Sequence, residues 1–134
     1  MTDHRKPLLI VVDDERDMAE IVGHVGESVG FEVKIATSGT EFQQIWKERK
    51  PDAVVMDIIM PEIDANELIE WVIENDKTVP IILNSGYGEM YLPSVKVLAS
   101  ARGANIIDTL TKPINFERLE TAFMKILRRD RNQG

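Results

Sequence analysis

Several residue types that would define a structural class are missing or scarce in this 134-residue sequence. Cysteine is absent, which excludes both a disulfide framework and a thiolate metal site. The purely apolar runs are far too short to span a bilayer, and residues 1–6 (MTDHRK) lack the apolar stretch of a secretion signal. We therefore expect a cytoplasmic protein that does not enter a membrane.

Basic residues are fewer than acidic residues. The 16 lysines and arginines stand against 23 aspartates and glutamates, which gives a formal net charge of −7. Because contacts with a phosphate backbone need a basic surface, we expect this chain not to bind nucleic acid directly. The two histidines, His4 and His24, have no companions at metal-ligand spacing, and we assign both to structure or surface.

Length and composition indicate one globular domain. Charged residues make up 29% of the sequence and hydrophobic residues 43%, which is ordinary for a soluble protein. A chain of this length can bury a substantial core. We expect a single domain over residues 1–134 with its core at about 8–127. The polar tail 128–134 is expected to fray or to lead into a linker.

Apolar runs alternate with helical periodicity along the whole chain. Short runs predict strands at 8–12, 31–35, 53–57, 79–83 and 106–110, and helical spacing marks helices around 18–29, 42–46, 68–72, 97–101 and 116–127. Most of the strands are continuously apolar, as in a parallel sheet covered on both faces. The pattern predicts an α/β fold of five strand–helix units, doubly wound with right-handed crossovers. Trp46 and Trp71 fall on helix faces, where we expect core or interface anchors.

Chemically suited side chains follow the strands of this predicted sheet. Asp13 and Asp14 follow the first strand, Asp57 ends the third, Ser85 comes shortly after the fourth, and Lys112 follows the fifth. Each has an ordinary explanation alone: acids favour helix starts and turns, and serine and lysine are common in loops. The carboxyl ends of parallel strands share one edge, however, and ligands bind there in open α/β sheets. Their coincidence favours one shared site.

The combination of groups points to phosphoryl transfer. Three carboxylates repel one another by a few kcal/mol per close pair at an effective dielectric of about 20, and a hard divalent cation such as Mg²⁺ relieves that repulsion. Lys112 and Ser85 supply an amine and a hydroxyl for the oxygens of a phosphoryl group. Asp57 is then the nucleophile that becomes an aspartyl phosphate, while the surrounding groups position it and stabilise charge.

The sequence resembles the receiver domain of two-component response regulators from residue 8 to about 127. The resemblance is carried by Val11-Val12-Asp13-Asp14-Glu15, Met56-Asp57 with Met60-Pro61, Ser85-Gly86 and Thr111-Lys112-Pro113. It implies a flavodoxin-like fold with strand order 2-1-3-4-5. It also implies a phosphoacceptor signalling domain that assists only its own phosphorylation and dephosphorylation and does not act as an enzyme on other substrates.

The resemblance also implies roles for individual residues. Asp57 would be phosphorylated by a histidine kinase or a histidine phosphotransfer protein. The output surface of the domain would lie near the fourth helix, the fifth strand and the fifth helix. It would bind a downstream output domain or form a homodimer. Asp13 would act on the metal through water. Mg²⁺ would be bound by Asp14, Asp57 and the backbone carbonyl of Ile59, and the phosphoryl group by Ser85 and Lys112.

Three features depart from the family pattern. Ala65 stands where many relatives have glycine, and a turn that needed positive φ there would be strained. Thr109 replaces an aromatic residue, so no aromatic side-chain movement can report phosphorylation. The stretch from Ser85 to Lys112 is about five residues longer than usual, which should lengthen the fourth helix or its flanking loops. Its residues 90–95 (MYLPSV) are similar to receivers fused to cyclic-dinucleotide phosphodiesterases.

Two other functions were weighed against this interpretation. A magnesium-dependent aspartyl phosphatase usually has its nucleophile and acid two residues apart after the first strand, which the adjacent Asp13 and Asp14 do not match. A phosphorylation-independent interaction module would have no need of the complete set of acidic, hydroxyl and amine groups. Turnover of an external phosphoester would support the first alternative, and failure to bind beryllofluoride the second.

Overall fold

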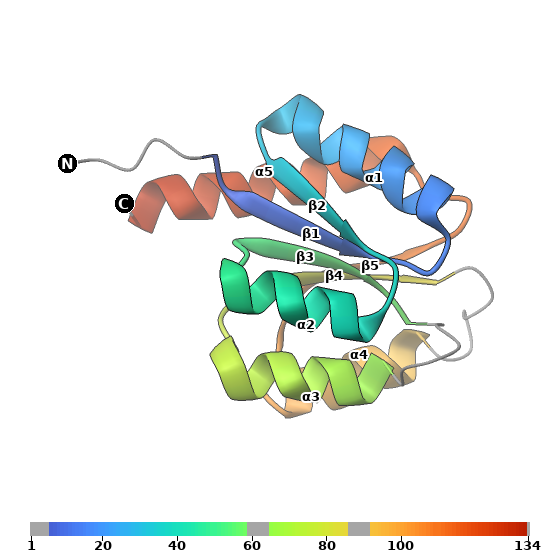
Figure 1. Ribbon diagram of the computed structural model, residues 1–134, viewed down its shortest axis with the longest axis vertical. Helices are drawn as coiled ribbons and strands as arrows, with labels where there is room; N and C mark the ends of the chain where they lie inside the picture. The colour runs from blue at the N-terminus through green and yellow to red at the C-terminus, as the bar shows by residue number, and fades with distance from the viewer. Residues whose placement is uncertain (1–5, 59–64, 86–91, 134) are drawn as a thin grey trace.

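Strands and helices alternate strictly along the chain in the computed structural model, which describes residues 6–58, 65–85 and 92–133 (Figure 1). The predicted alternation of five strands and five helices is confirmed. The elements are β1 (Leu8–Val12), α1 (Arg16–Val29), β2 (Glu32–Ala36), α2 (Gly39–Glu48), β3 (Ala53–Asp57), α3 (Ala65–Asp76), β4 (Pro80–Ser85), α4 (Leu92–Ala101), β5 (Asn105–Thr111) and α5 (Phe116–Gln133).

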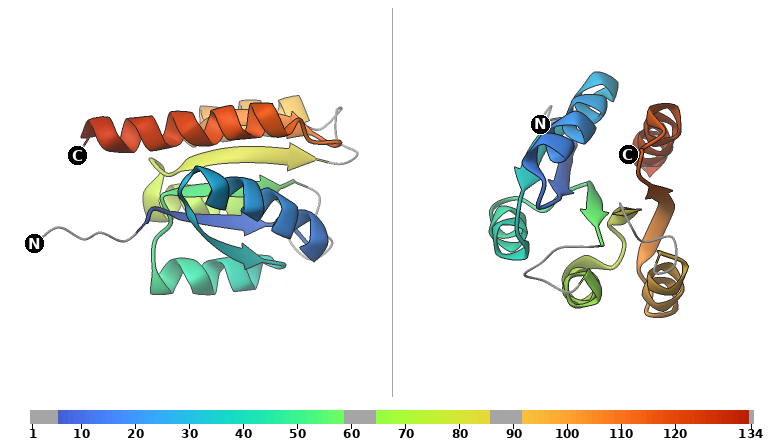
Figure 2. Two further views of the ribbon diagram at one scale, coloured as in Figure 1. Left: turned by 90° about the horizontal axis from the view of Figure 1, so that it is seen from above. Right: turned by 90° about the vertical axis from the view of Figure 1, so that its right-hand side faces the viewer.

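The strands form one parallel sheet in the order β2-β1-β3-β4-β5. This is the flavodoxin-like order implied by the resemblance, so that expectation is also confirmed. Viewed toward the strand ends, α1 and α5 cover one face of the sheet, and α2, α3 and α4 cover the other (Figure 2). The carboxyl ends of all five strands consequently point to the same edge of the molecule.

Both faces of the sheet are buried, which explains why the strands are continuously apolar. In β1, Leu8, Ile10 and Val12 belong to the core beneath α2, α3 and α4. The alternate residues Leu9 and Val11 belong to the core beneath α1 and α5. Successive side chains of a strand point to opposite faces, so a strand covered by helices on both sides needs apolar residues at every position.

Glycine permits close packing and ends a helix in α1. A Cβ atom on Gly26 would lie 2.6 Å from Cδ2 of Leu9, so only glycine lets α1 approach β1 this closely. Gly30 has φ of 116°, and its backbone N–H bonds the carbonyl oxygens of the last turn. That left-handed conformation is the usual helix end formed by glycine, which confirms the predicted end of this helix.

Aromatic side chains join α2 to α3. The rings of Trp46 and Trp71 lie 5.3 Å apart between centroids and meet edge to face, and the ring centroid of Phe42 lies 6.0 Å from that of Trp71. Such contacts add about 0.5–1.5 kcal/mol per pair to the burial of apolar surface. The predicted role of the two tryptophans as core anchors is confirmed.

The structure corrects two expectations and refines a third. The last helix is longer than the predicted 116–127, because α5 continues to Gln133, and arginine, which occurs three times in 128–133, is a good helix former. Ala65 is not strained, since it is the first residue of α3 and no described non-glycine residue has positive φ. Part of the extra length between Ser85 and Lys112 is a β-bulge in β5. Ile81 pairs with Ile106 and Ile82 with Asp108, so Ile107 has no partner on β4.

Candidate functional site

The ammonium group of a lysine and two carboxylates meet at the carboxyl edge of the sheet. Asp13 follows β1, Asp57 is the last residue of β3, and Lys112 follows β5. Lys112 Nζ lies 3.5 Å from Asp13 Oδ2 and 3.5 Å from Asp57 Oδ2. The two aspartates are 1% and 4% exposed, so these charges face one another with little solvent between them. The topology thus brings together residues that the sequence separates widely.

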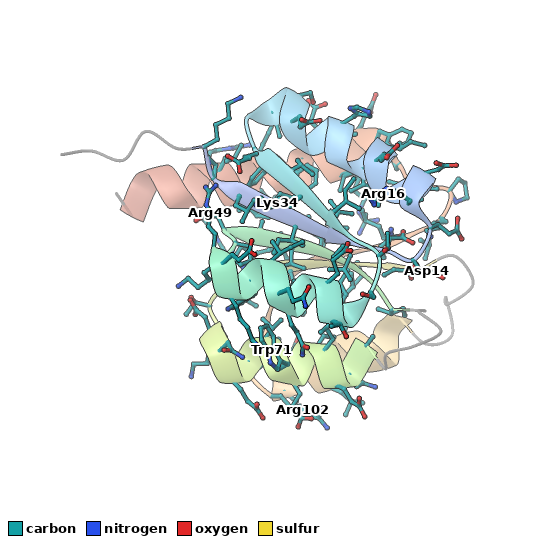
Figure 3. All side chains as sticks on the ribbon, in the orientation of Figure 1. Asp14, Arg16, Lys34, Arg49, Trp71 and Arg102 are labelled. Carbon is teal, nitrogen blue, oxygen red and sulfur yellow. The ribbon has the colours of Figure 1, made fainter. Side chains whose placement is uncertain are left out.

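Asp14 completes a cluster of three carboxylates at this edge. One carboxylate oxygen from each of Asp13, Asp14 and Asp57 lies within 4.8 Å of the others. Among the described residues, no other three acidic, histidine or cysteine side chains come together in this way. Asp14 is exposed at the end of β1, whereas the other two are buried (Figure 3). Hard oxygen ligands, few in number and open to solvent on one side, suit Mg²⁺, which keeps several waters. The residues present therefore fit a magnesium ion.

The electrostatics of the site follow from its burial. Burial, reinforced by the neighbouring Asp57, raises the pKa of Asp13 from 3.8 to about 6, against the opposing effects of the Glu15 backbone N–H and Lys112. Burial would lower the pKa of Lys112, but the charges of Asp57 and Asp13 outweigh it, and the pKa is raised overall. Lys112 accordingly stays protonated and places a positive charge beside the two carboxylates.

Two of the predicted site residues cannot be placed completely. Ser85 is the last residue of β4, so its backbone lies at the same edge as Asp57, but its side chain is outside the described part of the structure. Ile59 lies outside the described residues. The structure therefore joins Asp13, Asp14, Asp57 and Lys112, and for Ser85 it gives the position of the backbone alone.

The structure adds one residue that the sequence analysis did not single out. Asn84 is 1% exposed and is the register partner of Asp57 on the neighbouring strand. It joins Asp13 and Asp57 as the only buried polar or charged residues in the part of the chain that is described. The available signal was a lone polar residue within the apolar run 80–84 (PIILN), directly before Ser85.

No helix among the described residues is long and apolar enough to cross a membrane. Asp14 is exposed, so a partner can reach the acidic edge of the sheet from solvent.

Comparisons with known proteins agree with the fold. The model of the response regulator receiver domain matches residues 9–124. The chain is 31% identical over 119 residues to the chemotaxis protein CheY of Thermotoga maritima, covering 88% of this chain and 95% of that protein. It is 29% identical to the alkaline phosphatase synthesis transcriptional regulatory protein PhoP of Bacillus subtilis, covering 90% of this chain and 48% of that protein.

Solved structures lead to the same family. A response regulator from Colwellia psychrerythraea superposes with a TM-score of 0.77 at 30% identity, covering 92% of this chain and 98% of that one. The chain spans about half the length of the transcriptional regulators that it matches. The family match extends over the sheet, the helices and the edge that carries Asp13, Asp57 and Lys112, and on this basis the chain belongs to the response regulator receiver domains of two-component systems.

Proposed function

We propose that this receiver domain accepts a phosphoryl group on Asp57 from a histidine kinase or a histidine phosphotransfer protein, in a reaction that requires Mg²⁺. The observation that carries the proposal is the position of Lys112 Nζ, 3.5 Å from both Asp57 and Asp13, beside a cluster of three carboxylates. A structural ion pair has no need of a third, exposed carboxylate at the same point.

The transfer is a substitution at phosphorus. A carboxylate oxygen of Asp57 forms a bond to the phosphorus of a phosphohistidine, while the P–N bond breaks and its electron pair stays on the imidazole nitrogen. The transition state is loose, so positioning and charge stabilisation account for most of the catalysis. Lys112 supplies a fixed positive charge to the phosphoryl oxygens, and the Ser85 hydroxyl donates a hydrogen bond to another of them.

The metal site is part of the same proposal. Asp14, Asp57 and the backbone carbonyl of Ile59 would bind Mg²⁺ directly, and Asp13 would act on it through water. A bound Mg²⁺ supplies positive charge to the phosphoryl oxygens and removes the repulsion among the three carboxylates. Burial, reinforced by the charge of Asp57, raises the pKa of Asp13.

A partner would recognise the phosphorylated state at a surface formed by α4, β5 and α5. Side chains there are exposed although apolar, among them Val97 at 66%, Leu98 at 46% and Phe116 at 48%. Isolated exposed apolar residues are common, but several on adjacent elements favour a surface that binds a partner. A groove of about 470 Å³ lies between β5 and α5 and is lined by Asn105, Ile106, Ile107, Lys125, Arg128 and Arg129. The partner would be a downstream output domain or a second copy.

Intact mass spectrometry tests the proposal. Incubation with acetyl phosphate, a small phosphodonor, should add one phosphoryl group in Mg²⁺ and none in EDTA. The matched control is Asp57→Asn, which removes a charge at nearly constant shape and should stay folded without being labelled. Labelling of this variant at the wild-type level would overturn the assignment of the nucleophile. Turnover of an external phosphoester would favour a phosphatase instead.

A further inference from the structure

Three buried polar side chains lie side by side at the carboxyl edge of the sheet. Asp13 follows β1, Asp57 ends β3, and Asn84 is next to last in β4. Asp57 and Asn84 are register partners, and residues that pair across parallel strands point to the same face of a sheet. Their exposures of 1%, 4% and 1% set them apart from the other polar residues that the structure describes. Asn84 therefore belongs to the site by position as well as by burial.

Asn84 differs from the two aspartates because its hydrogen bonding is incomplete. Its side-chain oxygen Oδ1 is buried and accepts no hydrogen bond within the described structure. An unsatisfied buried acceptor is destabilising, and native structures retain few of them. Leucine would fill a similar volume without that penalty. An asparagine at this point therefore calls for a role other than packing.

The strand register places the Lys112 side chain on the same face of the sheet as Asn84. Leu110 is the register partner of Asn84 on β5 and belongs to the core beneath α1 and α5. Lys112 comes two residues later, so it starts on the same face. Its ammonium reaches Asp57 and Asp13, which lie beyond β4 in the strand order. The lysine side chain must cross the end of β4 to reach them, on the face that Asn84 occupies.

We propose that Asn84 is a positioning residue for Lys112, whose ammonium donates a hydrogen bond to Asn84 Oδ1 once Asp57 carries a phosphoryl group. This inference rests on the function proposed above. In the structure Lys112 is 3.5 Å from each carboxylate, at the outer limit of hydrogen bonding, and an ammonium has three N–H donors. When Lys112 turns toward phosphoryl oxygens, Asn84 keeps one donor bound and fixes the ammonium across β4.

A neutral acceptor suits this position better than the alternatives. A third buried carboxylate would increase the repulsion that already raises the pKa of Asp13. An apolar side chain would leave the lysine without a partner between β5 and β3. The amide oxygen offers an acceptor and adds no charge.

The variant Asn84→Leu separates this role from a structural one. We expect its free energy of unfolding to equal or exceed that of the wild type, because an unsatisfied buried acceptor is removed. Labelling at Asp57 by acetyl phosphate should nevertheless slow roughly tenfold, the effect of losing one hydrogen bond to a charged group in the transition state. The matched control is Ile82→Val, on the same strand and face, which should lower stability and leave the labelling rate unchanged.

A second measurement follows the lysine itself. The nitrogen resonance of the Lys112 ammonium should shift when beryllofluoride is added to the wild type, and shift less in Asn84→Leu. Labelling of Asn84→Leu at the wild-type rate, or parallel losses of stability and rate, would overturn the role of Asn84 while leaving the proposed function in place. A wild type that is never labelled at Asp57 would overturn the proposed function, and this inference with it.

Discussion

Lys112 Nζ lies 3.5 Å from Oδ2 of Asp57 although 55 residues separate them in the sequence. Two helices and two strands, α3, β4, α4 and β5, lie between the two positions in the chain. The contact exists because parallel strands bring their carboxyl ends to one edge, where β3 ends in Asp57 and β5 is followed by Lys112.

Magnesium should stabilise the folded protein. A ligand that binds only the native state at about 100 times its dissociation constant adds about 2.7 kcal/mol to the free energy of unfolding. Thermal melts with and without millimolar Mg²⁺ measure this effect. Asp14→Ala should reduce the response, since Asp14 is the exposed member of the carboxylate cluster. An unchanged magnesium response in that variant would contradict its assignment as a ligand.

Asp76 should make stability fall at low pH. Its hydrogen bonds from Lys50 at 2.6 Å and from Thr78 lower its pKa from 3.8 to about 2. A carboxyl whose pKa is depressed on folding stabilises the native state above pH 4, and this contribution is lost as the pH falls toward 2. The Lys50 side chain is 58% exposed, so we expect only about 1 kcal/mol for the contribution of Asp76.

Urea unfolding of the wild type and Asp76→Asn measures this contribution. The difference in unfolding free energy should be largest at neutral pH and shrink between pH 4 and pH 2. Lys50→Met should lose part of the same stability. A difference that grows as the pH falls would show that the sign is wrong.

The phosphorylation signal should travel through Ser85 to α4. Thr109 is not aromatic, which leaves the backbone that follows Ser85 as the expected route. Of the described side chains in α4, Ala99 alone is buried, while Val97 and Leu98 are exposed. The described part of α4 thus makes few buried apolar contacts, and a helix held by few such contacts shifts at low cost. Hydrogen exchange with and without beryllofluoride should therefore differ most between residues 85 and 103. A change confined to α2 and α3 would contradict this route.

The phosphorylated form should be long-lived. Hydrolysis needs an in-line water, and receiver domains resemble one another in placing two variable side chains near it, here Ile59 and Tyr87, which lie outside the described residues. Ile59 offers no hydrogen bond, and losing a water-positioning contact worth about 1.4–2.7 kcal/mol slows hydrolysis roughly ten- to a hundredfold.

Phosphate loss from the purified phosphoprotein measures that lifetime. Ile59→Asn and Tyr87→Glu should each accelerate it, because both introduce a polar group that can orient water. If neither variant loses phosphate faster than the wild type, these side chains do not shield the site.

The sequence by itself determined the alternation of strands and helices, because continuously apolar strands and periodic helices are local patterns. It also located Asp13, Asp14, Asp57 and Lys112 at strand ends, since each ends a predicted strand or follows one within two residues. The motifs around them carried the resemblance to receiver domains, and through it the strand order.

The tertiary structure decided what depends on contacts between distant segments. A polar residue inside an apolar run has no local signature of function, so Asn84 acquired significance only when pairing placed it beside Asp57. The bulge at Ile107 depends on the register of β5 against β4, which strand composition does not specify. The 3.5 Å contacts of Lys112 likewise arise because β4 separates β5 from β3, and only packing of the whole sheet fixes that spacing.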